Sequence, residues 1–479
     1  MFGMKTVVEP EREIRVVEEV DVVVAGGGIA GVAAAVAAAK SKAEVLLVER
    51  NGYLGGVATA GLMASMGNRF FADGRLVVRG IALEMVDRLA EKGGTCAGWK
   101  SPLVPKIPFD PELLKLVLIE MVEEAGAELY FHTLVADTVM SENELKGVIV
   151  EDKSGREGIV SKVVVDATGD ADVAARAGAP FDYQPPGSNS MEFRMGNANL
   201  HKTYEYFKEN PERYPSDMDV PRSFEEFEKN WLENGFFYYP HGGGQKPGSN
   251  IAQLVEKAMK NGDFATEKGM TTGLDAFGMD GLSWNNTVII NSNFSRIDDL
   301  DVREESKAEA NARKCCFYVA AFLRKYVPGF EESYIIATAP DLGVRATRKI
   351  IGEYTLTNEE IKTGARFKDV IGVGSSGYPG VPFDIPYRCM FPQRVEGLLV
   401  ASGKSVSTKP IGLLRGMTTC ILLGHAAGVA AALAATEMIP PRELDIGRLQ
   451  SSLLGQTVYL GNEIRLRSLG LAPRRSDEF

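Results

Sequence analysis

The stretch that most constrains this chain begins at Val22 and reads VVVAGGGIAGVAAAVAAAK. It joins an apolar, strand-like segment at Val16–Ala25 to an alanine-rich segment at Ile29–Lys40 that has the composition of a helix. A second apolar segment, Glu44–Glu49, predicts another buried strand. Strand, glycine turn, helix and strand within about thirty residues make a βαβ unit. We therefore expect a parallel sheet and a fold of the α/β class.

The glycines of this turn have the spacing Gly26-x-Gly28-x-x-Gly31. In a dinucleotide-binding unit the first glycine permits a tight turn, the second lets the backbone approach a pyrophosphate, and the third lets the helix pack closely on the strand. The helix N-terminus, which includes Ala30, supplies free N–H groups to phosphates. Glu49 ends the second strand, where its carboxylate can accept hydrogen bonds from ribose hydroxyls and would repel a 2′-phosphate. The unit is therefore predicted to bind a dinucleotide.

Charge and cysteine usage argue against several classes of protein. The net charge is −11, from 53 basic and 64 acidic residues, which disfavours a nucleic-acid-binding protein. The five cysteines form no CxxC motif and no cluster with histidine, so an iron–sulfur, zinc or other metal site is not expected. No membrane segment is expected either, because the longest apolar runs, at Val32–Ala39 and Val429–Ala434, are short or rich in alanine. We expect a soluble, cytoplasmic protein, and a homo-oligomer is compatible with the sequence.

Three further features favour FAD over NAD as the dinucleotide. Arg50–Met63 is a second stretch of glycine and small residues, which suits the close backbone approach that an isoalloxazine and its ribityl chain need. Val163–Asp170 is an apolar strand that ends in ATGD. Gly397–Ala401 is another such strand, and Gly412–Gly416 opens a long helix whose N-terminus can face the N1/C2=O edge of a flavin. A second formal GxGxxG, at Gly372–Gly377, precedes Tyr-Pro-Gly-Val-Pro, which cannot open a helix, so no unit for NAD(P)H is predicted.

Together these features resemble flavoproteins of the glutathione-reductase-like superfamily. More specifically, they resemble the FAD-dependent oxidoreductase family related to the flavoprotein of fumarate reductase and succinate dehydrogenase. The segments that carry the resemblance are GGGIAG (26–31), ERNGYLGG (49–56), DATGD (166–170), RATRKIIGEYTL (345–356), IPYRCMFP (385–392) and LLVASGKSVSTKPIGLLRGMTTCILLGHAAGVAAALA (398–434). The resemblance implies FAD that is held noncovalently in an extended conformation.

The chain is expected to divide into a discontinuous FAD-binding domain and an insertion. The segment between Tyr183 and Phe294 is rich in glycine, proline, asparagine and aromatic residues and has weak periodicity, which indicates a substrate-facing cap. We therefore expect a Rossmann-like, parallel-sheet FAD-binding domain in two parts, with an inserted mixed α+β cap between them and a peripheral tail. The expected boundaries are 1–185 and 375–440 for the FAD-binding domain, 186–374 for the cap and 441–479 for the tail.

The resemblance also implies which residues surround the cofactor, from the pyrophosphate to the isoalloxazine. They are Gly26, Gly28, Ala30, Gly31, Glu49, Arg50, Gly55, Gly56, Ala58, Val135, Ala167, Thr168, Gly169, Asp170, Ser402, Gly403, Leu413, Leu414 and Arg415. Within this set the backbone of Val135 would meet adenine, and Leu413, Leu414 and Arg415 would lie beside the isoalloxazine.

The candidate catalytic residues follow from the needs of flavin oxidation, which include a base and a cation near N1. Arg415, backed by a helix N-terminus, is the candidate cation, and a salt bridge at a helix start is the alternative. Arg345 and Arg348 could bind an anionic substrate group or form structural ion pairs. His241, in YYPHGGG, could reach a substrate. Many relatives carry an Asp–His pair after the Tyr-Pro at 378–379, but this chain has Gly-Val-Pro there, so the base stays unassigned.

The predicted function is an FAD-dependent oxidoreductase that moves a hydride between a small polar organic substrate and flavin N5. Three alternatives remain open: a fumarate-reductase-like C=C reductase fed by a partner chain, a flavoprotein subunit that only relays electrons, and an FAD-dependent tRNA-modifying protein, which the negative charge disfavours. His425 and the vicinal pair Cys315–Cys316 are expected to pack in the core rather than to take part in chemistry.

Overall fold

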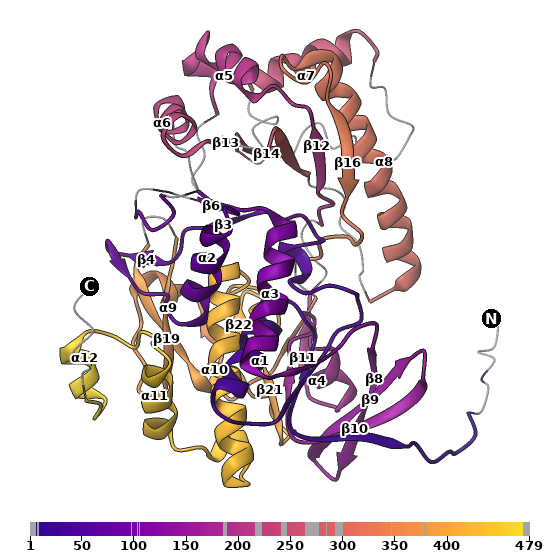
Figure 1. Ribbon diagram of the computed structural model, residues 1–479, viewed down its shortest axis with the longest axis vertical. Coiled ribbons are helices and arrows are strands. Elements are labelled where there is room, and N and C mark those ends of the chain that lie inside the picture. Colours follow the sequence, from indigo (N-terminus) through magenta and orange to yellow (C-terminus); the bar gives the residue numbers. More distant parts are fainter. Residues whose placement is uncertain are drawn as a thin grey trace.

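The chain forms two domains that lie one above the other in Figure 1, the first below and the second above. The computed structural model describes residues 6, 9–96, 98–102, 104, 106–184, 189–215, 223–240, 247–263, 277–283, 285–292, 300–345, 347–377 and 380–472. A seven-stranded mixed sheet organises the first domain, and a five-stranded antiparallel sheet organises the second.

The large sheet contains the predicted βαβ unit at its centre. Its strands are β1 (Val16–Ala25), β2 (Val45–Val48), β7 (Glu128–Tyr130), β8 (Leu134–Ser141), β9 (Glu144–Asp152), β10 (Gly155–Asp166) and β21 (Leu398–Val400). The parallel part has the order β7-β2-β1-β10, and β21 pairs in parallel with the end of β10. The first half of β10 pairs instead with β9 in an antiparallel meander, β10-β9-β8. The end of β1 is fully buried, which explains its continuous apolar sequence.

Helices and short strand pairs complete the first domain. Its helices are α1 (Ile29–Lys40), α2 (Ile81–Glu91), α3 (Pro111–Ala125), α4 (Asp172–Arg176), α9 (Asn358–Thr363), α10 (Met417–Glu437), α11 (Ile446–Gly455) and α12 (Glu463–Ser468). The paired strands are β3 (Ser65–Gly67) with β6 (Lys106–Pro108), β4 (Phe71–Ala72) with β5 (Arg75–Leu76), β11 (Phe181–Tyr183) with β17 (Arg348–Ile350), β18 (Leu356–Thr357) with β22 (Thr408–Lys409), and β19 (Val370–Ser375) with β20 (Pro382–Pro386).

Helices α1 and α10 pack against each other and on the sheet with their backbones in contact. A Cβ atom added to Gly424 would lie 2.0 Å from the carbonyl oxygen of Ala30, and one added to Gly428 would lie 2.1 Å from that of Ala34. Two glycines on one face of α10, four positions apart, therefore permit the close crossing. Both helices are apolar on all sides because protein surrounds them.

Within the described part of the chain, α10 is the one helix long and apolar enough to cross a membrane. Its bounds agree with the long helix that the sequence predicts after Gly412–Gly416. Of its most apolar window, 94% is buried inside the protein, against α1 and the sheet. Its place in the core accounts for its apolar composition.

His425 lies in the middle of α10 and is buried, as predicted. Its Nδ1 accepts a hydrogen bond from the amide of Ile81 at 3.4 Å, and its Nε2 lies 3.0 Å from Oε1 of Gln456. Burial lowers the pKa of His425 to about 4. The histidine therefore stays neutral in the folded protein at a pH where an unfolded chain already binds a proton.

Acidification should therefore destabilise the fold through His425. Between pH 6.5 and pH 4 the unfolded state binds the extra proton, so the free energy of unfolding should fall by about 3 kcal/mol through this side chain alone. In the variant His425→Gln this part of the pH dependence should disappear. Urea unfolding of both proteins at several pH values measures it, and equal pH slopes for the two proteins would contradict the assignment. Other titrating carboxyls are common to both proteins and cancel in the difference.

The second domain is a cap built on five short strands. Its elements are β12 (Phe193–Gly196), β13 (Phe236–Tyr239), β14 (Phe277–Leu282), β15 (Thr287–Ser292), β16 (Tyr334–Thr338), α5 (Leu200–Lys208), α6 (Phe224–Asn234), α7 (Asn250–Lys260) and α8 (Val302–Tyr326). The strand order is β13-β14-β15-β12-β16. Cys315 and Cys316, on α8, are buried in the aromatic-rich core of this domain, as predicted.

Two domain boundaries in the packed structure differ from those expected from the sequence. The core of the cap runs from Met191 to Val344, whereas Ile350 and Val370 already belong to the core of the first domain. The expected end of the cap at residue 374 is therefore too late. The expected peripheral tail is also wrong, because Leu449 and Leu453 of α11 are fully buried in the first core. The apolar spacing of α11 on a short helix is the signal for this packing.

Candidate functional site

The first glycine turn has the geometry that its spacing predicts. Gly26 has φ of 102°, in the left-handed region, and a Cβ atom there would lie 2.6 Å from the carbonyl oxygen of Ala167 at the end of β10. A Cβ atom on Gly31 would lie 1.8 Å from the carbonyl oxygen of Gly26. Both positions therefore exclude a side chain, and the turn brings the start of α1 against the carboxyl end of the sheet.

The second glycine-rich loop lies beside this turn. Gly28 and Gly55 form a bridge, and the amide of Gly55 donates to the carbonyl of Gly27 at 2.8 Å. A Cβ atom on Gly56 would lie 3.5 Å from the Cα of Gly28. In contrast, a Cβ atom on Gly28 itself would meet no atom of the described residues within 4 Å, although Gly28 caps α1. The backbone at this position is thus open to a close ligand at a helix N-terminus, which fits a dinucleotide phosphate.

Glu49 is fixed at the end of β2, next to the glycine turn. It is 7% exposed, and its carboxylate accepts hydrogen bonds from the amide of Gly27 at 2.6 Å and from the amide and side chain of Asn51 at 2.8 and 2.9 Å. This places an acid where a ribose would lie. Arg50 points outward, with its side chain 65% exposed and Nη2 3.9 Å from Asp341.

Asp166 organises the ATGD turn after β10. Its buried carboxylate accepts hydrogen bonds from the amide of Thr168 at 3.0 Å, the hydroxyl of Thr168 at 2.7 Å and the amide of Ala174 at 2.9 Å. Burial raises the pKa of Asp166 to about 6. Thr168 is therefore held as a structural link in the turn, and Ala167 beside it contacts Gly26.

An ion pair joins the ATGD turn to the turn after β21. Lys404 Nζ lies 3.0 Å from Asp170, which also accepts a hydrogen bond from the hydroxyl of Thr347 at 2.6 Å. The hydroxyl of Ser402 donates to the carbonyl of Gly169 at 3.3 Å. Two predicted cofactor segments that are far apart in the sequence, 169–170 and 402–403, are therefore neighbours in the structure. Lys404 was not predicted, and its ammonium adds a positive charge at this end of the sheet.

The remaining predicted cofactor residues lie around the start of α10 and at the sheet edge. A Cβ atom on Gly403 would lie 2.0 Å from the carbonyl oxygen of Leu414, so the turn after β21 contacts the loop before α10. Leu414 is buried and Leu413 half-buried. Ala58 is buried in a single 3₁₀ turn that follows Gly55. Ala30 is in the first turn of α1, and Val135 is half-buried near the start of β8.

Three guanidinium groups gather where α10 begins. Arg415 precedes Gly416, the N-cap of α10, and a Cβ atom on Gly416 would lie 3.6 Å from Nη1 of Arg69. Desolvation and then Arg69 lower the pKa of Arg415; desolvation and then Arg415 lower that of Arg345. Guanidinium groups stay charged despite such shifts. Arg69, Arg345 and Arg415, here called the arginine trio, therefore add to the positive end of the α10 dipole and favour an anion.

The cap turns a polar face of its sheet toward the first domain. Arg194 of β12, Ile289 of β15, Asp280 of β14 and Tyr238 of β13 form one row across four strands. Glu192 lies two residues before Arg194 and so is on the same side. Residues on the opposite side of these strands form the core of the cap.

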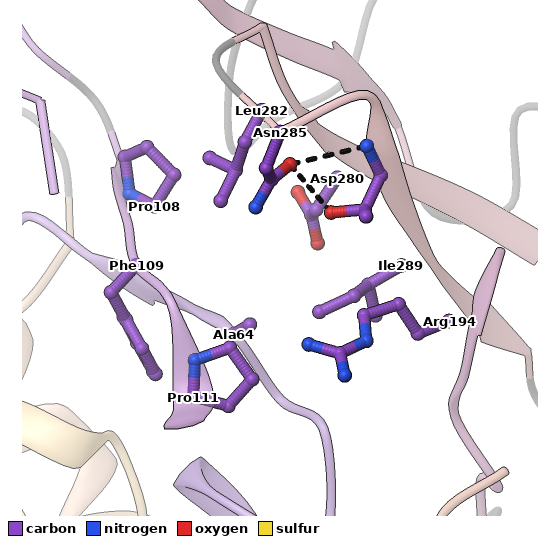
Figure 2. A pocket seen from close by; sticks show the side chains of 10 residues that line it. Ala64, Pro108, Phe109, Pro111, Arg194, Asp280, Leu282, Asn285 and Ile289 are labelled. Atoms are coloured by element: carbon purple, nitrogen blue, oxygen red, sulfur yellow. Dashed lines mark hydrogen bonds between the residues drawn. The ribbon is translucent and has the colours of Figure 1, made fainter. Parts of the chain in front are cut away.

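Contacts from this polar face cross to the antiparallel strand pair of β3 and β6. The hydroxyl of Ser65 donates to Oδ2 of Asp280 at 3.1 Å, and Nζ of Lys106 lies 3.8 Å from Oδ1. The same ammonium lies 4.0 Å from the ring centre of Tyr238. In Figure 2, Arg194 and Asp280 point into a small cavity between the domains. The first domain contributes Ala64, Pro108, Phe109 and Pro111 to the cavity wall.

Burial raises the pKa of two acids at this boundary, Glu192 and Asp280. Glu192 is 3% exposed and Asp280 8%. Burial, and then the charge of Asp280, raise the pKa of Glu192 well above its usual range, although Lys106 and Arg345 act to lower it. Burial also raises the pKa of Asp280, against Lys106 and Ser65. Within the described residues, Oε2 of Glu192 and Oδ1 of Asp280 accept no hydrogen bond.

A family comparison decides between the dinucleotides. The FAD dependent oxidoreductase family matches residues 21–453, most of the chain. The chain belongs to this family. The protein is thus an FAD-dependent oxidoreductase enzyme with an α/β, Rossmann-like fold, and FAD is its cofactor.

A thiamine thiazole synthase from Methanococcus vannielii is 28% identical over 201 residues, which are 38% of this chain and 70% of that protein.

Solved flavoprotein structures resemble this FAD-dependent oxidoreductase along most of its length. A p-nitrophenol 4-monooxygenase from Pseudomonas putida DLL-E4 is 11% identical with a TM-score of 0.47, covering 95% of this chain and 93% of that one. An L-proline dehydrogenase from P. horikoshii is 14% identical with a TM-score of 0.44, covering 86% and 92%. At these values the likeness carries no information about the substrate.

The structure places the predicted catalytic residues in different surroundings. Arg345 and Arg415 come together in the arginine trio. Arg348 instead forms an ion pair with Asp172 at 2.8 Å and lies over the ring of Phe181, which is the structural alternative that the sequence left open. His241 lies outside the described residues. The second GxGxxG falls in the hairpin of β19 and β20 and not before a helix, as predicted.

Sequence reasoning missed Arg69, Lys106, Glu192, Arg194 and Asp280. A signal existed in Met191–Gly196, where apolar Met191, Phe193 and Met195 alternate with Glu192 and Arg194. Such alternation is typical of a strand with one buried and one polar face. It does not reveal what the polar face meets, because that depends on pairing with distant strands.

Proposed function

We propose that this enzyme transfers a hydride between FAD and a small organic substrate that carries a carboxylate group. The observation that supports the proposal is the arginine trio: Arg415 precedes the N-cap of α10, Arg69 lies beside that cap, and the charge of Arg415 acts on Arg345. Leu413 and Leu414, which are expected beside the isoalloxazine, directly precede Arg415. A guanidinium pairs with a carboxylate in a fixed, bidentate geometry and so orients as well as attracts the substrate.

When bound, FAD would accept or supply two electrons at N5. Gly26, Gly28, Gly31 and Glu49 would hold its adenosine and pyrophosphate part, and Gly55, Gly56 and Leu414 its ribityl and ring part. The arginine trio would bind the substrate anion and counter negative charge near the start of α10. The cap sheet, which contacts the strand pair of β3 and β6, would exclude water from the other side.

A spectral titration tests the proposal directly. The FAD-loaded protein is titrated with benzoate and, as the matched uncharged probe, benzamide, and the absorbance of the flavin is recorded. Benzoate should perturb the spectrum with saturation and benzamide should not. Equal responses would contradict an anion site beside the flavin. Release of the pigment by acid tests in the same sample whether the FAD is noncovalent.

The variant Arg69→Ala should weaken benzoate binding. A hydrogen bond to a charged group contributes about 1.5–3 kcal/mol, so the dissociation constant should rise about 10- to 100-fold. The control is Arg88→Ala, which removes an arginine from α2 whose partners are Glu84 and Glu124. A change of the same size in both variants would show that the effect is not specific to the trio.

The fumarate-reductase-like alternative gains support from the same region, because it needs paired arginines and an acid. One anaerobic experiment separates the two. If oxidation of a C–H bond is the reaction, 2-hydroxy acids should bleach the oxidised flavin. If C=C reduction is the reaction, an unsaturated dicarboxylate should reoxidise flavin that dithionite has reduced. A protein that responds in neither direction but exchanges electrons with a partner chain would be the electron-relay subunit.

A further inference from the structure

The small cavity between the two domains is polar on the side of the cap and apolar on the side of the first domain (Figure 2). The cap contributes Arg194 of β12, Asp280 of β14, and Asn285 and Thr287 from the connection between β14 and β15. The free volume of the cavity is about 10 Å³, which is room for one atom of the size of an oxygen. A single polar atom of a ligand can therefore enter between these side chains.

The polar side chains of this cavity have hydrogen-bonding atoms that the protein does not use. Within the described residues, Nε of Arg194 and Oδ1 of Asp280 are buried and have no hydrogen-bond partner. The side-chain oxygen of Asn285 accepts hydrogen bonds from the amide and hydroxyl of Thr287 at 3.1 and 2.6 Å, so its NH₂ group faces the cavity in Figure 2. Buried polar atoms without partners cost free energy. The cavity thus offers two donors and one acceptor to the atom that enters it.

The charges around the cavity restrict the kind of group that fits. Nζ of Lys106 lies 3.8 Å from the unpaired oxygen of Asp280, and Arg194 adds a second positive charge, so an ammonium group is repelled. A carboxylate oxygen would face the carboxylate of Asp280 with no proton between them, and a methyl group would leave all three atoms unpaired. A hydroxyl group has one donor and two acceptor lone pairs, which match the one acceptor and two donors of the cavity.

We propose that this cavity binds a hydroxyl group of the substrate, and that the substrate is therefore a hydroxylated carboxylate. The proposal rests on the proposed function, because it takes the arginine trio as the place where the carboxylate binds. Ala64, in the cavity wall, is five residues before Arg69 of the trio, so their Cα atoms are at most about 18 Å apart. Arg194 and Asp280 are then the residues that distinguish a hydroxylated substrate from its deoxy counterpart.

Matched pairs of acids test the hydroxyl site in the FAD-loaded protein. Hydroxyalkanoates with a terminal hydroxyl, of increasing chain length, are compared with the alkanoates that have a methyl group in its place, and each affinity is measured by competition with benzoate. The two members of a pair have nearly the same size and differ in hydrogen bonding. At the chain length that reaches from the trio to the cavity, the hydroxy acid should bind about 10- to 100-fold more tightly. Equal affinities at every length, which a cavity that takes up only water would give, would overturn the proposal.

The variant Arg194→Met should remove this preference and leave the protein folded. The side chain of Arg194 makes no hydrogen bond or ion pair within the described residues, so the melting temperature of the apoprotein should equal or exceed that of the wild type. The hydroxy acid and its methyl counterpart should bind this variant equally well. The control Arg324→Met, on the exposed side of α8, should keep the wild-type preference. A preference that survives in Arg194→Met would overturn the assignment.

The same measurements distinguish failure of this proposal from failure of the proposed function. If benzoate does not bind the wild-type protein, the carboxylate site at the arginine trio is wrong and the hydroxyl site is wrong with it. If benzoate binds and no matched pair shows a preference for the hydroxy acid, only the hydroxyl site is wrong.

Discussion

Replacing Gly28 by valine should abolish FAD binding and leave the protein folded. Gly28 has φ of −63°, which any residue can adopt, and among the residues that the structure describes a Cβ atom there meets no atom within 4 Å. A valine side chain would instead occupy the space at the N-terminus of α1 that the FAD pyrophosphate needs. We expect the affinity for FAD to fall at least about 100-fold, or about 2.7 kcal/mol. Calorimetric titration of the apoprotein with FAD measures it.

The chain offers a matched control in its second GxGxxG. A Cβ atom on Gly377, the last glycine of that motif, also meets nothing within 4 Å in the described part of the chain. Gly377→Val should therefore bind FAD like the wild type, and both variants should have the melting temperature of the wild-type apoprotein. Retention of FAD by Gly28→Val would show that the cofactor does not lie against this turn.

Replacing Gly428 by alanine should destabilise the whole first domain. Its Cβ atom would lie 2.1 Å from the carbonyl oxygen of Ala34 and 2.9 Å from the Cβ of Ala37, so α10 and α1 must move apart. Overpacking of this kind costs about 3 kcal/mol, and the better helix propensity of alanine offsets about 1 kcal/mol. We expect a net loss of about 2 kcal/mol in urea unfolding. FAD retention should weaken with it, because α1 carries the glycine turn.

Gly447 supplies the helical control for this second experiment. It lies in the first turn of α11, and within the described residues its added Cβ would come no closer than 3.4 Å to a neighbour, Oδ1 of Asp445. Gly447→Ala should thus be neutral or slightly stabilising. A neutral result for Gly428→Ala as well would mean that the helices can separate without cost.

The FAD-binding half of the molecule was readable from sequence because its signals are local. The strand Val16–Ala25 and the helix Ile29–Lys40 have the predicted bounds in the structure. The spacing of the glycines between them is enough to predict the geometry of the turn. The turns around Gly55 and Asp170 were assigned by resemblance, and the structure brings them to the same edge of the sheet. Whether each assigned residue touches FAD stays a prediction.

The substrate side could not be read because it is made by pairing between distant segments. Asp280 contacts Ser65, which is 215 positions away in the sequence, and no local sequence pattern around either residue predicts this contact. The start of α10 lies beside Arg69, and no local pattern around Arg69 indicates that contact. Arg345 and Arg348 are three positions apart and look equivalent in sequence, yet one joins the arginine trio and the other pairs with Asp172.

The contact between α1 and α10 also governs the order in which the protein can be assembled during synthesis. The ribosome releases α1 and the glycine turn early, but α10 and β21, which complete the same core, come after the entire cap. Domains generally fold as units while the chain emerges. The cap, which is contiguous in sequence, can therefore fold before α10 covers the apolar surface of α1. The core around the glycine turn can therefore be completed only after α10 has been synthesised.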